Sequence, residues 1–143
     1  MYKVLIVDDE AVVRSGIALG VDWAQMGCVV VGEASGGREG LAMALRHRPD
    51  LIVADIRMPG MDGIQMLTAL RANGCGAKVI MLTAYNDFTY VQSALRLGAA
   101  DYLLKPFRDQ DLAATVARLL RRESAAKAPE PEALPVQRGQ NKY

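Results

Sequence analysis

The sequence predicts an α/β fold in which five βα units form a doubly wound parallel β-sheet. Short aliphatic runs alternate with amphipathic segments along most of the chain. The runs are almost continuously apolar, which is typical of strands buried on both faces of a parallel sheet. The chain has 143 residues, of which 51% are hydrophobic, so it is long enough for one domain with a sizeable core.

Five segments have the composition of buried strands, being short, rich in aliphatic residues and bounded by polar or turn residues. In chain order they are YKVLIV at 2–7, CVVVGEA at 28–34, LIVAD at 51–55, KVIML at 78–82 and DYLL at 101–104. The intervals between them are long enough to hold a helix that crosses back over the sheet. Crossovers of this kind join strands in parallel.

The intervals carry apolar residues at helical spacing, so each predicts one amphipathic helix. In chain order the apolar stripes comprise Val13, Ile17 and Val21; Leu41 and Leu45; Ile64, Leu67 and Leu70; Phe88, Val91 and Leu95; and Leu112, Val116, Leu119 and Leu120. Helices that follow successive strands cover both faces of an open sheet. We therefore expect a flavodoxin-like strand order, 2-1-3-4-5.

The charge and hydropathy of the chain argue against several classes of protein. A formal net charge of +1 gives no electrostatic reason to expect binding to nucleic acid or to a membrane surface. The start, MYKVLIVDDE, lacks the pattern of a signal peptide, and no apolar run approaches the ~18 residues that span a bilayer. Cys28 and Cys75 lie far apart with no CxxC motif. We expect reduced packing cysteines in a cytoplasmic protein.

The composition changes at about Glu123. The segment ESAAKAPEPEALPVQRGQNKY contains three prolines and has no apolar periodicity. Such a segment buries too little apolar surface to fold by itself. We expect residues 1–122 to form the folded domain and residues 123–143 to be a disordered tail or the stub of an interdomain linker.

Polar side chains follow four of the predicted strands at the point where each strand ends. They are Asp8, Asp9 and Glu10 after the first strand, Asp55 after the third, Thr83 after the fourth and Lys105 after the fifth. Taken singly, each has a structural explanation as a helix cap, a turn residue or a strand terminator. In doubly wound folds, however, ligands bind outside the carboxyl ends of the strands where the strand order reverses. We therefore expect Asp8, Asp9 and Asp55 to converge on one crevice.

Three crowded carboxylates repel one another unless a cation or a proton relieves the charge. An oxygen-only cluster suits Mg²⁺, and Lys105 adds a compact positive charge of the kind that binds phosphate. A carboxylate can attack phosphorus to form an aspartyl-phosphate, and Asp55, on a central strand, is the natural nucleophile. Asp8 and Asp9 would then hold the metal, and Thr83 would offer a hydroxyl donor.

The motifs LIVDDE, ADIRMPGMDG, LTAY and DYLLKPF resemble, in this order and spacing, the receiver domain of bacterial two-component response regulators, over residues 2 to about 121. The resemblance implies a CheY-like fold and a phosphoacceptor, Asp55, that receives its phosphoryl group from a sensor histidine kinase in a Mg²⁺-dependent reaction. It implies that Asp8, Asp9 and Asp55 bind Mg²⁺ together with the backbone carbonyl of Arg57.

The same resemblance assigns the remaining positions of the switch. Thr83 and Lys105 would contact the phosphoryl group, and the rotamer of Tyr102 would follow phosphorylation. The bond before Pro106 is expected to be cis. The face formed by the fourth helix, the fifth strand and the fifth helix would be a homodimerisation surface.

A narrower resemblance points to receivers attached to AraC-type helix-turn-helix transcription factors. It lies in VDWAQMGCVVVGEASGG and AYNDFTYVQSALRLGAADYLLKPF, through Trp23, Gly27 and the spacing of Tyr85, Phe88 and Tyr90. Trp23 and Phe88 can equally be core aromatics. The resemblance implies a DNA-binding parent regulator whose output domain is absent from this chain, so the chain itself would not bind nucleic acid.

Other classes of protein remain as alternatives. A Mg²⁺-dependent aspartate-nucleophile phosphohydrolase shares the fold and the metal, but its nucleophile follows the first strand in a DxD pattern, whereas this chain has DDE. A flavin carrier would need a phosphate loop in place of these acids. A degenerate receiver that acts as a scaffold would not need the acids or Lys105. We therefore expect a switch domain and not a turnover enzyme.

Overall fold

The computed structural model describes residues 1–84 and 86–127, and for residues 123–127 it describes the backbone alone. The elements alternate as the sequence predicts. In chain order they are β1 (Tyr2–Val7), α1 (Ala11–Gly20), the short 3₁₀-helix η1 (Ala24–Met26), β2 (Cys28–Ala34), α2 (Gly37–His47), β3 (Leu51–Asp55), α3 (Gly63–Ala72), β4 (Lys78–Thr83), α4 (Phe88–Arg96), β5 (Asp101–Leu104) and α5 (Asp109–Lys127). The five predicted strands are confirmed, and β4 runs one residue further, to Thr83.

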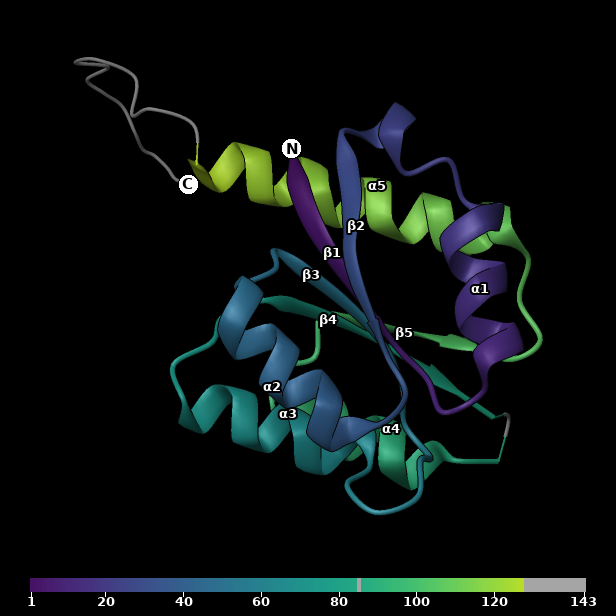
Figure 1. The fold of residues 1–143 in the computed structure, drawn as a ribbon, viewed down its shortest axis with the longest axis vertical. Coiled ribbons are helices and arrows are strands. Elements are labelled where there is room, and N and C mark those ends of the chain that lie inside the picture. The colour runs from purple at the N-terminus through teal and green to yellow at the C-terminus, as the bar shows by residue number, and fades with distance from the viewer. Residues whose placement is uncertain (85, 128–143) are drawn as a thin grey trace, which may run out of the picture.

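The five strands form one sheet in the order β2-β1-β3-β4-β5, and every neighbouring pair is parallel. The predicted order is therefore confirmed. Helices α1 and α5 cover one face of the sheet, and α2, α3 and α4 cover the other (Figure 1). This doubly wound arrangement brings the carboxyl ends of all five strands to one edge, which we call the carboxyl edge. The opposite edge, where the strands begin, is the amino edge.

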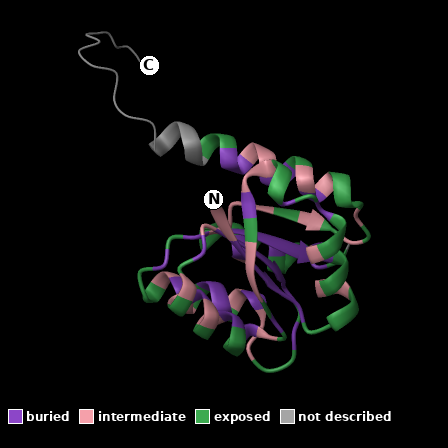
Figure 2. Cartoon of the chain, turned by 45° about the horizontal axis from the view of Figure 1, so that its top comes forward, coloured by how far each residue is buried: buried purple, intermediate pink, exposed green. Residues whose placement is uncertain are grey.

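Two apolar clusters form the core, one on each face of the sheet. The residues of β1, β3 and β4 alternate between them, so that Leu5 and Ile52 face α2 and α3 while Ile6 and Val53 face α1 and α5. The strands at the centre of Figure 2 are accordingly buried, whereas the outer sides of the helices are exposed. Burial on both faces explains why these strands read as continuous apolar runs.

The apolar stripe predicted for α4 is wrong in part. Val91 is buried, but Phe88 and Leu95 are exposed. The buried side of α4 is formed by Val91 and Ala94, and Phe88 and Leu95 lie about a quarter turn around the helix from it. Of the two aromatic residues that were candidates for the core, only Trp23 is buried, and its indole Nε1 donates to the carbonyl of Ile17 at 3.2 Å.

The predicted boundary after residue 122 falls inside a helix, because α5 continues to Lys127. Residues 123–127 read ESAAK, which are good helix formers, and the first proline comes at residue 129. Tyr85 and residues 128–143 lie outside the described residues, so the rest of the expected tail stays a prediction. Among the helices that are described, none combines the length and the hydropathy that a membrane crossing requires. Both cysteines are buried and unbridged.

Candidate functional site

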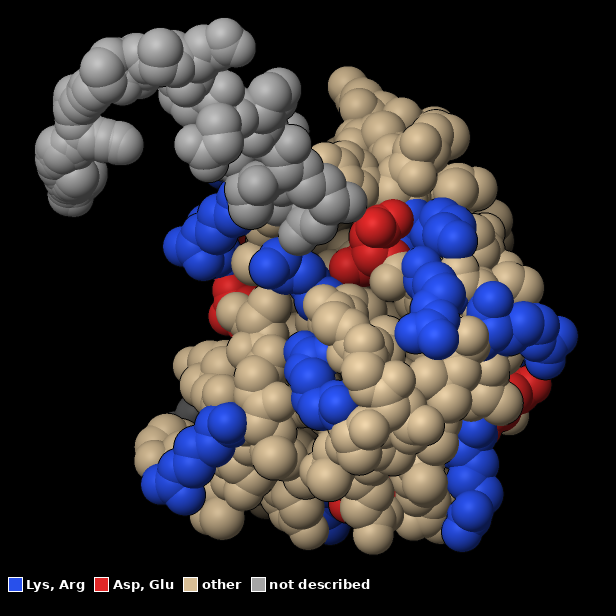
Figure 3. All heavy atoms as spheres, turned by 90° about the vertical axis from the view of Figure 1, so that its left-hand side faces the viewer, with Lys and Arg blue, Asp and Glu red and all other residues tan. Residues whose placement is uncertain are grey.

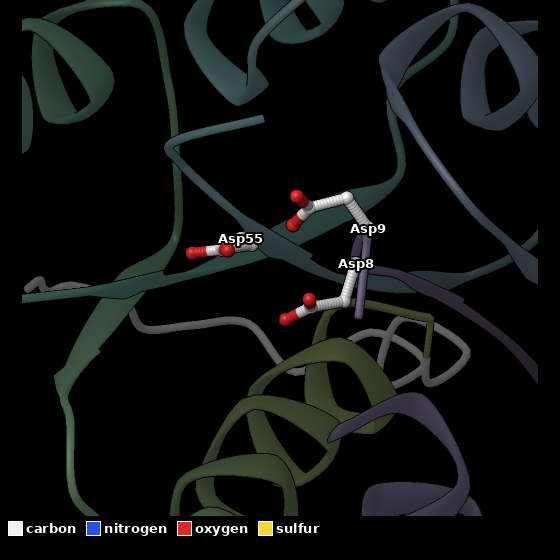
Figure 4. Close-up of side chains that lie close together, drawn as sticks. All are labelled: Asp8, Asp9 and Asp55. Carbon is white, nitrogen blue, oxygen red and sulfur yellow. The ribbon is translucent and has the colours of Figure 1, made fainter. Parts of the chain in front are cut away.

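The register of the two central strands places two acidic residues side by side. β1 and β3 pair in parallel with Val7 opposite Ala54, so Asp8 and Asp55 come next along each chain. Asp9 follows on the loop that leads into α1. Asp8, Asp9 and Asp55 each offer one carboxylate oxygen, and these three oxygens lie within 4.8 Å of one another. Figure 4 shows the three side chains gathered on the same side of the strand ends. The predicted convergence is therefore present.

Two of these carboxylates are buried, and their burial changes their acidity. Asp8 is fully buried and Asp55 is 7% exposed, whereas Asp9 is exposed. Burial, and after it the neighbouring charge of Asp8, raise the pKa of the Asp55 carboxyl to about 6, although Lys105 acts in the opposite direction. Burial is also the main cause that raises the pKa of Asp8. The site therefore concentrates more negative charge than its protein surroundings stabilise.

Lys105 is the cation nearest to this cluster. Its Nζ lies 3.4 Å from Oδ2 of Asp55 and 3.7 Å from Oδ2 of Asp8. The position of its backbone follows from the pairing of β5 with β4, because Thr83 lies opposite Leu104 and the amide of Lys105 then donates to the carbonyl of Thr83 at 2.8 Å. The bond between Lys105 and Pro106 is cis, as the resemblance implied. The sequence prediction that Lys105 points into the crevice agrees with these distances.

The other predicted site residues lie around the cluster. Thr83, at the end of β4, is buried, and its hydroxyl donates to the carbonyl of Ala84 at 3.3 Å. Tyr102 lies on the outer side of β5, 39% exposed. It lines a surface pocket of about 360 Å³ together with Ala84, Phe88, Val91 and Leu104. The structure therefore brings Asp8, Asp9, Asp55 and Lys105 together and leaves Tyr102 on the surface beside them.

Arg57, whose backbone carbonyl was expected to bind metal, follows Asp55 by two residues. Its side chain is largely exposed, and its Nη1 donates to a carboxylate oxygen of Asp87 at 3.1 Å. The role of this carbonyl in binding metal stays a prediction.

Two residues that position the site were missed by the sequence analysis. The guanidinium of Arg14 donates to the backbone carbonyl of Asp8 at 2.6 Å, and its Nε lies 3.7 Å from Glu33 on β2. Arg14 is the only charged residue of α1, and a single arginine on an otherwise apolar helix could have indicated from the sequence that its side chain has a specific partner. Gly63 approaches the end of β3 so closely that a Cβ there would lie 2.6 Å from the carbonyl oxygen of Asp55.

The residues present fit a divalent cation. Oδ2 of Asp8 is buried and has no hydrogen-bond partner, since Lys105 is too distant for one. Oδ1 of Asp8 accepts from the amide of Glu10 at 2.9 Å, which fixes the orientation of the carboxylate. An orphaned buried oxygen beside two further carboxylates is a set of hard donors of the kind that Mg²⁺ prefers. Asp8, Asp9 and Asp55 would hold it.

Comparison with known proteins supports the same reading. The response regulator receiver domain family matches residues 4–117. The chain is 30% identical over 120 residues to the uncharacterized transcriptional regulatory protein YesN of Bacillus subtilis, covering 84% of this chain and 33% of YesN. It is 35% identical over 121 residues to the transcriptional regulatory protein HptR of Staphylococcus aureus, covering 85% of this chain and 47% of HptR. The chain thus spans between a third and a half of these curated relatives.

Solved structures are similar over nearly the whole folded part. The REC domain of AraT, a response regulator from Geobacillus stearothermophilus, is 42% identical with a TM-score of 0.77, covering 86% of this chain and 98% of that chain. A two-component transcriptional regulator AraC from Clostridium phytofermentans is 26% identical with a TM-score of 0.81, covering 90% of this chain and all of the other. The chain therefore belongs to the response regulator receiver domain family, and its homologues include regulators of the AraC type.

Proposed function

We propose that this chain is a phosphoacceptor switch domain in which Asp55 receives a phosphoryl group from the phosphohistidine of a sensor histidine kinase. One observation carries the proposal: the buried Asp55 carboxylate lies in a cluster of three acids and 3.4 Å from the ammonium of Lys105. A phosphoryl group on Asp55 would bring its oxygens next to that cation. Membership of the receiver family supports the same partner.

Each residue of the site has a defined part in the transfer. A carboxylate oxygen of Asp55 attacks phosphorus, the P–N bond to the kinase histidine breaks, and the histidine nitrogen keeps the electron pair. With a pKa of about 6, Asp55 is mostly ionised at neutral pH and thus able to attack. Lys105 faces the phosphoryl oxygens, and Thr83 donates its hydroxyl once it leaves Ala84. Asp8, Asp9, Asp55 and the backbone carbonyl of Arg57 would hold Mg²⁺, which would neutralise charge on those oxygens.

The output of the switch is a change in an apolar surface. The exposed hydrophobic residues of α4 and β5 are Phe88, Tyr90, Leu95, Tyr102 and Leu104. We expect Tyr102 to move into the pocket beside Ala84 when Thr83 turns toward the phosphoryl group, so that the face formed by α4, β5 and α5 favours a homodimer. An exposed apolar patch of this kind fits a protein partner. The parent regulator would be a cytoplasmic DNA-binding protein, and its output domain would contact the DNA.

The phosphoacceptor is tested by intact mass spectrometry after incubation with Mg²⁺ and acetyl phosphate. We expect one added phosphate on the wild-type chain and none on Asp55→Asn. Asp22→Asn, which changes an exposed aspartate far from the cluster in sequence, is the matched control and should label like the wild type. Equal labelling of Asp55→Asn would refute the site. Steady release of phosphate over many turnovers would support the phosphohydrolase instead.

The output surface is tested by sedimentation velocity with Mg²⁺ and beryllofluoride, a mimic of the phosphoryl group. The dimer fraction should rise with the mimic, and Tyr102→Ala should reduce that rise. An unchanged sedimentation coefficient in a chain that mass spectrometry shows to be phosphorylated would remove dimerisation from the proposal and leave the phosphoacceptor intact.

A further inference from the structure

The side chain of Arg57 crosses the rim of the site and joins two segments that are far apart in sequence. Its Nη1 lies 3.1 Å from Oδ1 of Asp87, and its guanidinium carbon lies 5.0 Å from the centre of the Tyr90 ring. Arg57 belongs to the loop that follows the phosphoacceptor strand, whereas Asp87 and Tyr90 belong to the start of α4. The ion pair therefore ties the loop that follows Asp55 to the helix that lines the proposed output surface.

Asp87 occupies the N-cap position of α4, where the carboxylate of an aspartate normally accepts from helix amides and not from a distant arginine. It directly precedes α4, and aspartate is among the residues preferred at that position because its carboxylate accepts from the amides of the first helical turn. Here it makes no such bond, although it is only 8% exposed. Its backbone, at φ −101° and ψ 39°, also departs from the extended conformation usual for a cap. In contrast, Asp62 before α3 makes a complete capping box with Gln65.

The Asp87 carboxylate thus has two alternative partners, the guanidinium of Arg57 and the amides at the start of α4. We propose that Arg57 is a shared cation, which holds Asp87 in the unphosphorylated chain and turns to the phosphoryl group once Asp55 is phosphorylated. The released Asp87 then caps α4. The proposal rests on the proposed function, because it assumes that Asp55 carries the phosphoryl group.

Charge and reach both favour the exchange. A phosphoryl group carries nearly two negative charges at pH 7 and presents several oxygens. A guanidinium can therefore bind it through two hydrogen bonds, and more strongly than it binds one carboxylate oxygen of Asp87. Arg57 lies two residues from Asp55, and the two Cα atoms are therefore at most about 7 Å apart. The arginine side chain is long and largely exposed, so turning costs it only the ion pair with Asp87 and the contact with the Tyr90 ring.

The exchange also explains how α4 can respond to an event on β3. A carboxylate at the amino end of a helix is stabilised by the unpaired amides and by the helix dipole. Capping by Asp87 would order the first turn of α4, and departure of Arg57 would free the ring of Tyr90 on the same surface. This route acts on the start of α4 and is separate from the movement of Thr83 and Tyr102.

The test is the affinity of the chain for beryllofluoride in Mg²⁺, measured by titration on the wild type, Arg57→Gln, Asp87→Asn and the double variant. Arg57→Gln should weaken the affinity at least about threefold, since it removes a charged ligand. Asp87→Asn should strengthen it about two- to fivefold, the range of an ion pair whose cation is largely exposed, because Arg57 no longer has to leave a carboxylate. The double variant should match Arg57→Gln, because Asp87 acts only through Arg57.

Opposite signs are the decisive result. If the ion pair were only a structural tether, the two single variants would change the affinity in the same direction, and that outcome would overturn the proposal. Arg46→Gln, on the exposed end of α2, is the matched control and should leave the affinity unchanged. If the wild type failed to bind beryllofluoride at all and Asp55 took up no phosphate, the proposed function itself would fail.

Amide hydrogen exchange gives a second and independent readout. In Arg57→Gln without any mimic, Asp87 is free to cap, so the amides of Thr89 and Tyr90 should exchange several-fold more slowly than in the wild type. In the double variant Arg57→Gln/Asp87→Ala this protection should be lost, because alanine offers no acceptor for those amides. Exchange that is equally fast in Arg57→Gln and the wild type would contradict the capping step.

Discussion

The two edges of the sheet carry opposite charges that have different uses. At the carboxyl edge, Asp8, Asp9 and Asp55 crowd together around Lys105. At the amino edge, basic residues predominate; they include Lys3 and Lys78 at strand starts and Arg46, Arg71 and Arg96 in the last turns of helices. Figure 3 faces the side of the molecule toward which these helices end, and Lys and Arg side chains are spread over it. The net charge of +1 conceals this segregation.

The charges of the amino edge are explained by the fold itself. Cations in the last turn of a helix compensate its dipole. Arg71 donates to the carbonyls of Cys75 and Gly98, and Asp50 accepts from the amide of Lys3 at 2.8 Å. At the carboxyl edge the partners of the three carboxylates are too few for their charge: Oδ2 of Asp8 has no hydrogen bond, and the pKa of Asp55 is raised to about 6. A charge that the fold does not satisfy identifies the functional edge.

The comparison predicts that removing one carboxylate changes the free energy of unfolding in opposite directions at the two edges. The larger change is expected at Asp55. Its pKa in the folded chain, about 6, lies above its ordinary value of 3.8. The contribution of this carboxyl to stability is therefore complete below pH 3.8 and is lost as the pH rises through 6. Without Mg²⁺ the ionised group costs about 3 kcal/mol.

Asp55→Asn should accordingly raise the free energy of unfolding by about 2–3 kcal/mol in EDTA at a pH of about 8, measured by urea denaturation. The gain should shrink as the pH falls toward 4, where the wild type is protonated. Mg²⁺ should stabilise the wild type and have less effect on the variant. A variant less stable than the wild type under these conditions would show that the acidic cluster is not strained.

A smaller loss is expected at the amino edge. Asp50→Ala removes the carboxylate that accepts from the amide of Lys3 and leaves that amide without its partner at the start of β1. The free energy of unfolding should fall by about 1–2 kcal/mol. This loss should be the same with and without Mg²⁺, because Asp50 lies at the opposite edge from the acidic cluster. If the loss of unfolding free energy in Asp50→Ala depended on Mg²⁺, the two edges would not be independent of each other.

The smallest effect is expected for the exposed cations of the amino edge. Arg46→Gln removes one charge from the last turn of α2 and should lower the free energy of unfolding by about 0.3–0.5 kcal/mol at low ionic strength. Salt should reduce the difference, since the interaction is screened. Thermal denaturation at two salt concentrations measures it, and a salt-independent loss above about 1 kcal/mol would point to a packing role for the Arg46 stem instead.

Particular residues show where sequence reasoning succeeds and where it fails. The order of the strands and the meeting of Asp8 with Asp55 follow from runs that must be buried on both faces, because parallel strands end at a common edge. The face of α4 could not be found in this way. Phe88 and Leu95 share a helical period with Val91, yet the sheet meets α4 at Val91 and Ala94.

The sequence by itself determined the doubly wound sheet and the presence of an acidic crevice beside a lysine, since both depend on patterns that repeat within each βα unit. Only the tertiary structure decided which oxygen of Asp8 lacks a hydrogen bond, that Arg14 donates to the Asp8 carbonyl, and that Asp87 pairs with Arg57 and does not cap α4. These contacts join segments up to 30 residues apart. They depend on loop paths and on side-chain orientations, which leave no periodic trace in the chain.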